Sequence, residues 1–234
     1  MKWTMAVVVF LVFAMSFGAA AVVAPGSKYS AMSDYMMESD AEIALARSAA
    51  PENISGHATI KVLTAAGYKV AVEGNNGFVC VVMRGWSAPT FTPAGDRELV
   101  YDARVRAPIC FDSVASLTVL PYQELRTKLG MEGKDPDAIA SAVVTAYTLG
   151  ELPKMEGVAF AYMWSADSNL GPKVGAWHPH MMVYAPYYKN PMLGNECGEP
   201  VPCVAIDAGT PFAVVVIPVH GEAIKAKSVV SQKQ

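Results

Sequence analysis

Four cysteines constrain the fold of this chain more than any other feature. They are Cys80, Cys110, Cys197 and Cys203, and three complete pairings are open to them. Cys80 follows a turn-rich stretch and Cys110 precedes an expected helix start, whereas the segment between Cys197 and Cys203 is a compact loop rich in Pro and Gly. This arrangement favours the bridges Cys80–Cys110 and Cys197–Cys203. On a chain-entropy model they would stabilise the fold by about 3.7 and about 2.4 kcal/mol.

The N-terminus has the pattern of a secretory signal peptide. Lys2 gives a positive start, residues 6–15 form an apolar run, and Gly18 with the three alanines after it offers a cleavage site. The competing interpretation is a membrane anchor, but a spanning helix needs about twenty apolar residues and this run has about half that length. We therefore expect residues 1–24 to be removed and the protein to be periplasmic or secreted. Export favours disulfides, and because no Cys-x-x-Cys motif is present, structural bridges are favoured over redox chemistry.

Length and composition fit one compact domain. The chain has 234 residues, of which 53% are apolar and 17% charged, a balance that leaves little room for disorder outside the ends. We expect a linker over residues 25–39, a single domain over residues 40–220 and a flexible tail over residues 221–234. Loss of Lys2 would leave a weakly acidic chain without a basic stripe, which argues against nucleic-acid binding and against stable attachment to a membrane.

The spacing of apolar residues along the sequence predicts an α+β domain with a mostly antiparallel sheet packed by two to three helices. The first helix is expected to begin with a capping box formed by Ser39 and Glu42. Helices are predicted over residues 39–48, 122–129 and 135–150. Strands are predicted over residues 57–63, over residues 68–72 and 78–82 as a hairpin, and over residues 157–164, 179–185 and 211–218.

The candidate site is the expected strand pair within residues 157–186, which carries His178 and His180. Side chains two positions apart in a strand share a face, so both imidazoles can chelate one metal ion. Met182 and Tyr184 would continue this face. The residues expected to face the core are Met181, Val183 and Ala185.

Two metals suit this pair of histidines. Zinc would need a further ligand, for which Asp167 and Glu196 are the nearest acids in sequence. Copper(I) would accept methionine sulfur. The methionines at hand are Met163, Met181 and Met182. In the competing interpretation the histidines only line a solvated or partly buried sheet face.

Aromatic residues are dense in the same region and suggest a recognition surface. With Asp167, the predicted ligand-binding set is Tyr162, Trp164, Trp177, Tyr184 and Tyr187. Aromatic residues on strands also serve packing, which is the alternative. Ser165 and Asp167 lie near the histidines, but no known hydrolase motif surrounds them and turn chemistry explains them, so no catalytic residue is assigned.

Three segments resemble a group of uncharacterised exported bacterial proteins. They are Asn76-Gly-Phe-Val-Cys80, Pro108-Ile-Cys-Phe-Asp112 and Pro179-His-Met-Met-Val-Tyr-Ala-Pro-Tyr187. The resemblance implies a bacterial exported protein and carries no catalytic assignment. From the residues we expect a non-catalytic domain that binds an unknown small molecule or protein through the aromatic and histidine-bearing strand pair. The alternative is a metal-dependent, hydrolase-like enzyme that uses His178 and His180 with zinc or copper.

Overall fold

The computed structural model describes residues 29–86, 90–171, 178–194, 196–197, 201–219 and 225–226. The predicted signal peptide lies outside these ranges, as do Trp177, His220 and most of the predicted tail. Export and cleavage therefore stay predictions. Within the described ranges, no helix combines the length and the apolar character needed to cross a membrane.

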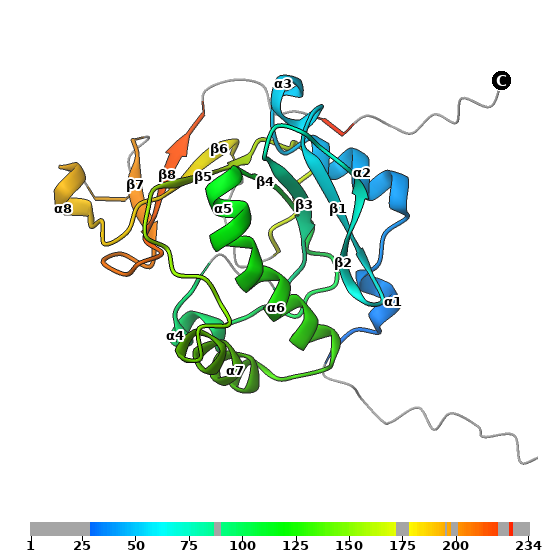
Figure 1. Cartoon of the computed structure of the whole chain (residues 1–234), viewed down its shortest axis with the longest axis horizontal. Helices are drawn as coiled ribbons and strands as arrows, with labels where there is room; N and C mark the ends of the chain where they lie inside the picture. The colour runs from blue at the N-terminus through cyan, green and yellow to red at the C-terminus, as the bar shows by residue number, and fades with distance from the viewer. Residues whose placement is uncertain are drawn as a thin grey trace, which may run out of the picture.

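A single sheet of eight strands runs through the middle of the described structure (Figure 1). The strands are β1 (Thr59–Thr64), β2 (Gly67–Val72), β3 (Val79–Met83), β4 (Ala107–Phe111), β5 (Ala159–Met163), β6 (His180–Tyr184), β7 (Cys203–Ile206) and β8 (Val214–Pro218). Their order across the sheet is β2-β1-β3-β4-β5-β6-β8-β7. All neighbours are antiparallel except β1 and β3, which are parallel. The α+β class and the mostly antiparallel sheet are confirmed.

The described residues contain eight helices, more than the two to three that were expected to pack the sheet. They are α1 (Met32–Tyr35), α2 (Ser39–Arg47), α3 (Glu52–Ser55), α4 (Pro93–Asp96), α5 (Ser113–Thr118), α6 (Leu120–Met131), α7 (Pro136–Thr148) and α8 (Asn190–Leu193). The three longest, α2, α6 and α7, correspond to the three predicted helices. Four of the others are single turns of four residues, too short to show a helical period.

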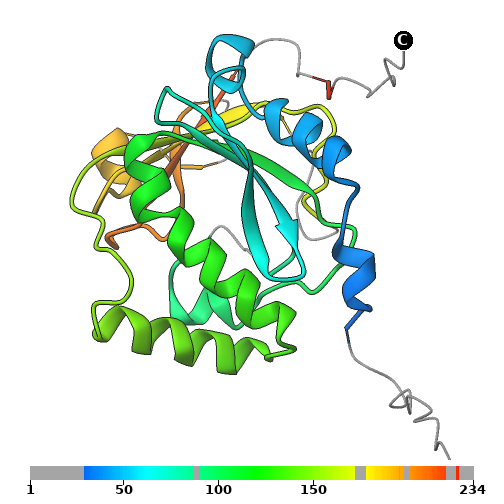
Figure 2. The same cartoon turned by 45° about the vertical axis from the view of Figure 1, so that its right-hand side comes forward.

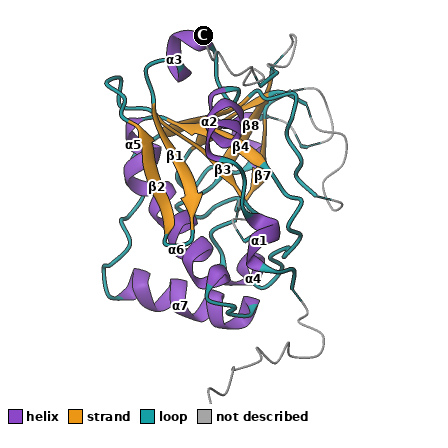
Figure 3. Ribbon diagram, turned by 90° about the vertical axis from the view of Figure 1, so that its right-hand side faces the viewer, coloured by secondary structure: helices purple, strands orange, loops and turns teal. Residues whose placement is uncertain are grey.

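Helices cover both faces of the sheet. Because side chains alternate along a strand, β3 sends Val81 and Met83 to the larger core and Cys80 and Val82 to a smaller one. Helix α2 contacts β1, β3 and β4 on the side of the smaller core, whereas α5 and α6 cover the larger core, and Figure 2 shows α6 crossing in front of the sheet. Helix α7 packs on α4 and α6 below the sheet (Figure 3). The larger core therefore extends from the sheet down to α7.

The predicted hairpin between residues 68–72 and 78–82 is wrong. Strand β2 pairs instead with β1, through a tight turn in which Gly67 adopts a φ of 90° and Thr64 is its strand partner. After β2 the chain crosses the start of β1, where a Cβ on Gly74 would lie 2.2 Å from the Thr59 nitrogen. This close crossing delivers β3 to the other side of β1 as a parallel neighbour. The Gly-Asn-Asn-Gly sequence is therefore part of a crossover.

The start of α2 also differs from the prediction, because Glu42 is not part of a capping box. The cap is Glu38, whose side chain accepts a hydrogen bond from the Asp40 nitrogen. Glu42 is instead fully buried, pairs with Arg84 at 2.8 Å and accepts a hydrogen bond from the Leu63 nitrogen. A charged pair without contact to water needs such partners, so Glu42 links α2 to the sheet.

Both predicted disulfides are present. Cys80 and Cys110 stand directly opposite each other on β3 and β4 with a Cα–Cα distance of 4.0 Å. Cys197 and Cys203 close the short loop before β7 with a Cα–Cα distance of 5.2 Å. The first bridge is buried between the sheet and α2, and the second ties Cys197 to the first residue of the edge strand β7.

Candidate functional site

The predicted strand pair is present as β5 and β6. In its antiparallel register Met163 faces His180 and Tyr162 faces Met181. Directly opposed residues of two neighbouring strands share a sheet face. His180 therefore belongs to the face of the larger core, whereas Tyr162 belongs to the opposite face.

The predicted orientation of β6 is wrong for Met182 and Tyr184. Both were expected on an open face beside the histidines, but they are almost fully buried in the larger core. The reason is that β6 is an interior strand whose His180, Met182 and Tyr184 row faces the packed side of the sheet. Ala185, expected to face a core, is buried in a small cluster at the far end of the sheet.

The two histidines lie at the start of β6 in different environments. His178 is exposed, whereas His180 is partly buried and its Nδ1 lies 2.8 Å from the His178 carbonyl oxygen. Burial lowers the pKa of His180, and the hydrogen bond to the His178 backbone opposes this shift. Among the described residues, no three His, Cys, Asp or Glu side chains are grouped closely enough to hold a metal ion. Metal binding by His178 and His180 stays a prediction.

The predicted aromatic set does not form one surface among the residues described. Tyr162 and Trp164 meet edge to face at 6.0 Å on the α2 side of the sheet, whereas Tyr184 is buried on the other side. Tyr187 lies beyond β6 and is 62% exposed. Asp167 is exposed and accepts a hydrogen bond from the Ala226 nitrogen at 2.7 Å, and Trp177 lies outside the described residues.

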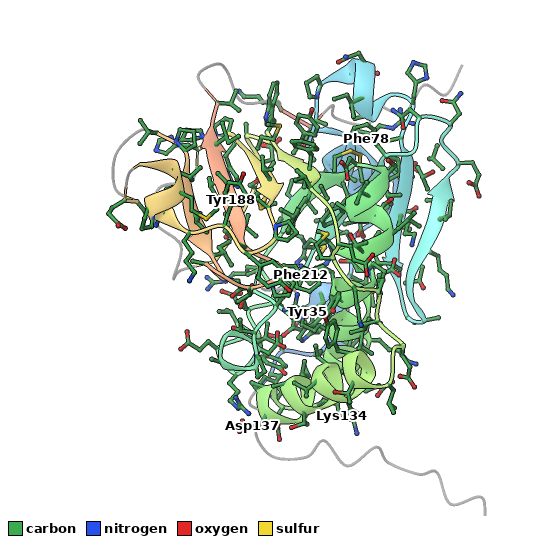
Figure 4. All side chains as sticks on the ribbon, turned by 60° about the vertical axis from the view of Figure 1, so that its left-hand side comes forward. Tyr35, Phe78, Lys134, Asp137, Tyr188 and Phe212 are labelled. Carbon is green, nitrogen blue, oxygen red and sulfur yellow. A yellow bond between two sulfur atoms is a disulfide. The ribbon has the colours of Figure 1, made fainter. Side chains whose placement is uncertain are left out.

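A pocket of about 250 Å³ lies elsewhere, where α4, α6, α7 and the segment before β8 meet. Its walls are mainly aromatic and aliphatic. Its lining residues include Phe91, Asp96, Tyr122, Val143, Val144, Tyr147 and Phe212. Figure 4 shows Phe212 on the side of the sheet that faces α7, which carries Asp137.

Four rings in contact form the inner wall of this pocket. Phe91 stacks on Phe212 at 4.6 Å and meets Tyr122 edge to face at 5.6 Å. Tyr122 also contacts Phe212 and, at 6.3 Å, Tyr147 of α7. Tyr184, one of the predicted ligand-binding residues, supports this wall from behind because its ring lies 6.1 Å from that of Phe91. Ring pairs at such distances stabilise a fold by about 0.5–1.5 kcal/mol each beyond the burial of their area.

The charged group of the pocket is Asp96, at the end of the one-turn helix α4. Pro93 occupies the first turn and the Thr92 hydroxyl accepts a hydrogen bond from the Gly95 nitrogen, so the sequence Thr-Pro-Ala-Gly-Asp sets this turn. Asp96 Oδ1 accepts a hydrogen bond at 2.6 Å from Nη1 of Arg126 on α6, and both side chains are about 1% exposed. Within the described structure, Asp96 Oδ2 has no hydrogen-bond partner.

Asp207 holds the loop before α4 against this buried pair. Its carboxylate accepts hydrogen bonds from the Thr90 hydroxyl at 2.9 Å and from the Phe91 nitrogen at 2.6 Å. Asp207 has a φ of 49°, a conformation that is uncommon outside glycine and that Asn and Asp tolerate best. The side chain of Arg126 lies 5.1 Å from the Phe91 ring centre. Asp207, directly after β7, and Arg126 of α6 therefore both contact the loop that leads into α4.

Burial is the main cause of the pKa shifts of Asp96 and Arg126. Desolvation raises the pKa of Asp96, with a further contribution from the negative charge of Asp207, and Arg126 opposes the shift. Desolvation also lowers the pKa of Arg126, although a guanidinium keeps its proton at neutral pH. A buried acid with one oxygen unsatisfied, beside an apolar pocket, is the feature expected of a binding site.

Sequence reasoning missed this pocket because its parts are far apart in the chain and carry no motif. Prolines interrupt residues 84–108 at three positions, so this stretch shows no sustained apolar period. No sequence spacing links Phe91, Asp96, Arg126 and Phe212. The one local signal was Thr92-Pro93, which predicts a helix start. Comparisons with models of protein families, with curated proteins and with solved structures found no match to this chain.

Proposed function

We propose that this chain is an exported, non-catalytic binding protein that holds a small ligand in the pocket between α4, α6, α7 and β8. The observation that carries the proposal is the buried Asp96 carboxylate, which contributes to the pocket wall and has an acceptor oxygen without a partner in the described structure. Leaving a buried acceptor unsatisfied costs about 1–3 kcal/mol. This oxygen has essentially no solvent-accessible surface in the described structure, so a ligand that donates a hydrogen bond to it must first displace neighbouring wall atoms, and it would then recover part of that cost.

The size of the pocket limits the ligand to about one ring. A cavity of about 150 Å³ is enough for benzene, and pockets for larger ligands begin at about 300 Å³. At about 250 Å³, the pocket fits a single ring with a short polar substituent. The aromatic wall supplies the apolar contacts, and Asp96 supplies the orientation.

Binding is favoured over catalysis by the composition of the pocket. The described lining residues include no histidine, cysteine or lysine. The hydroxyl groups of Tyr122, Thr148 and Thr210 donate to backbone carbonyl oxygens rather than to Asp96, so these residues form no hydrogen-bonded pair of nucleophile and general base. Asp96 itself is committed to Arg126 through one oxygen. The proposed role is therefore recognition, as expected from the sequence, but at a different place from the strand pair.

Export is part of the proposal. The signal-like N-terminus motivates it, and the two disulfides support it because such bridges persist in oxidising compartments. A periplasmic or secreted ligand-binding protein would meet small molecules outside the cytoplasm. N-terminal sequencing of the exported form should start between residues 20 and 25, whereas a start at Met1 would contradict export by cleavage.

Benzyl alcohol is a suitable first probe for the pocket, because it combines one ring with one donor. By ligand efficiency, eight non-hydrogen atoms give a dissociation constant on the order of 1 mM, which isothermal titration and saturation-transfer NMR can measure. Val144 lines the pocket on α7 and is 45% exposed, so Val144→Phe should weaken binding at least about tenfold by filling the space. Its neighbour Thr145 is exposed and is not among the lining residues. Thr145→Phe should bind like the wild type, and absence of saturable binding to the wild type would refute the proposal.

A further inference from the structure

We propose that the pocket selects a small organic ammonium ion with an aromatic or similarly apolar body. This inference rests on the function proposed above and narrows its ligand class. It is carried by the charges around the pocket and by which of them reach its wall.

Asp96 is the charged residue of the wall among the described lining residues. One of its oxygens is satisfied by Arg126, and the other has no partner among the described residues. An ammonium group carries three donors and a positive charge, whereas an alcohol offers one donor and no charge. The unsatisfied oxygen therefore gives a cation the larger gain.

The surrounding charges leave a net negative centre. In their ionised forms, the carboxylates of Asp96 and Asp207 and the guanidinium of Arg126 have a net charge of one negative unit. Arg97 also acts on Asp96, but its guanidinium is exposed and pairs with Asp137 at 2.9 Å, so its charge is offset and screened by solvent. At the buried Asp96 carboxylate, the uncompensated negative charge favours a cation more than it would in water.

An anionic ligand is disfavoured by the position of Arg126. Its Nε and Nη2 have no hydrogen-bond partner among the described residues, but the guanidinium lies behind the wall, beside the Phe91 ring and Asp96, and Arg126 is not among the residues that line the pocket. A carboxylate entering the pocket would meet Asp96 first. The aromatic wall formed by Phe91, Tyr122 and Phe212 then favours a ring or a similar apolar body on the ligand.

The test compares three probes of the same shape at pH 7 and low salt: benzylammonium, benzyl alcohol and benzoate. Benzylammonium should bind at least about tenfold more tightly than benzyl alcohol, and benzoate should bind more weakly than either. Equal affinities of benzylammonium and benzyl alcohol would overturn the charge selection and leave the pocket function intact. Binding of none of the three would overturn both, and tightest binding of benzoate would overturn the ammonium proposal.

Two variants test which charge selects the ligand. Asp96→Asn keeps an acceptor oxygen but removes the charge, so it should abolish the preference for benzylammonium over benzyl alcohol, whatever its effect on the affinity for the alcohol. Because that variant breaks a buried ion pair and can lose its fold, Asp207→Asn provides a second test. Asn tolerates the backbone conformation of Asp207, and the change removes one negative charge next to the pair. Because Asp207 also holds the loop that carries Phe91, the measured quantity is the ratio of the two affinities: Asp207→Asn should lower the preference for benzylammonium over benzyl alcohol several-fold, and an unchanged ratio would contradict the proposal.

Discussion

Replacement of Arg126 by methionine should destabilise the protein by about 3–5 kcal/mol at neutral pH. Arg126 and Asp96 are both about 1% exposed and join α6 to α4 at 2.6 Å. Removing one partner of such a pair leaves an uncompensated charge in the interior, which is the origin of that magnitude. Methionine fills much of the vacated space with apolar atoms, so loss of packing contributes little. The double variant Asp96→Leu, Arg126→Met should be close to the wild type, because both charges are then absent.

The pH dependence of the Arg126→Met variant provides a second measure of the same effect. Burial and Asp207 raise the pKa of Asp96 above its unfolded value, whereas Arg126 opposes the rise. The folded state therefore binds this proton more tightly than the unfolded state, so the contribution of Asp96 to stability is most favourable below pH 3.8 and is lost as the pH rises through the raised pKa. Without Arg126 that pKa rises further.

Urea unfolding of the wild type, the single variants and the double variant at pH 7.5 and pH 5 measures these energies. The cost of Arg126→Met should be smaller at pH 5 than at pH 7.5, because lower pH favours the proton on Asp96, which the folded variant binds more tightly than the wild type. A cost below about 1 kcal/mol at pH 7.5, an equal cost at both pH values, or a double variant as unstable as the single one would refute the reasoning.

Two further predictions concern the rest of the fold. Gly130→Ala should destabilise the protein by about 1–3 kcal/mol in thermal or urea unfolding, because its Cβ would lie 2.3 Å from the Trp86 ring. The control Gly157→Ala, whose Cβ meets open space among the described residues, should change stability by less than about 0.5 kcal/mol. Similar costs for both variants would contradict the packing of Gly130 on Trp86. Burial lowers the pKa of His180, so its stabilising contribution is present above about pH 6.5 and is lost as the pH falls through the lowered pKa. His180→Gln should therefore lose less melting temperature than the wild type between pH 7.5 and pH 5.5, and equal losses would show that His180 is not buried as a neutral group.

The parts of the fold that follow from local chemistry were predictable. Asp135-Pro136 begins α7 as expected, since the Asp135 side chain accepts a hydrogen bond from the Ala138 nitrogen. Both disulfides were also predictable, because turn residues and spacing favour local pairing. These features depend on contacts within a few residues or on a single crosslink.

The errors arose where distant segments decide the structure. Glu42 has the sequence position of a capping residue, but it is buried because it forms an ion pair with Arg84, the residue directly after β3. His180 and Tyr184 have polar groups, which suggested that this side of β6 is open to solvent. Strand β6 lies inside the sheet, however, and Met182 and Tyr184 are buried. The pocket combines segments that are more than a hundred residues apart, and no periodicity encodes such a meeting.

Methyl NMR of the labelled protein during titration with benzyl alcohol tests the proposed pocket most directly. Val143 and Val144 line the pocket, so a bound aromatic ring should shift their methyl signals in a saturable way. Val70 and Val158 are exposed valines that are not among the lining residues, and their methyl signals should stay unchanged. The account predicts saturable shifts confined to the pocket valines; shifts that are absent there, or equally large at Val70 and Val158, would contradict it.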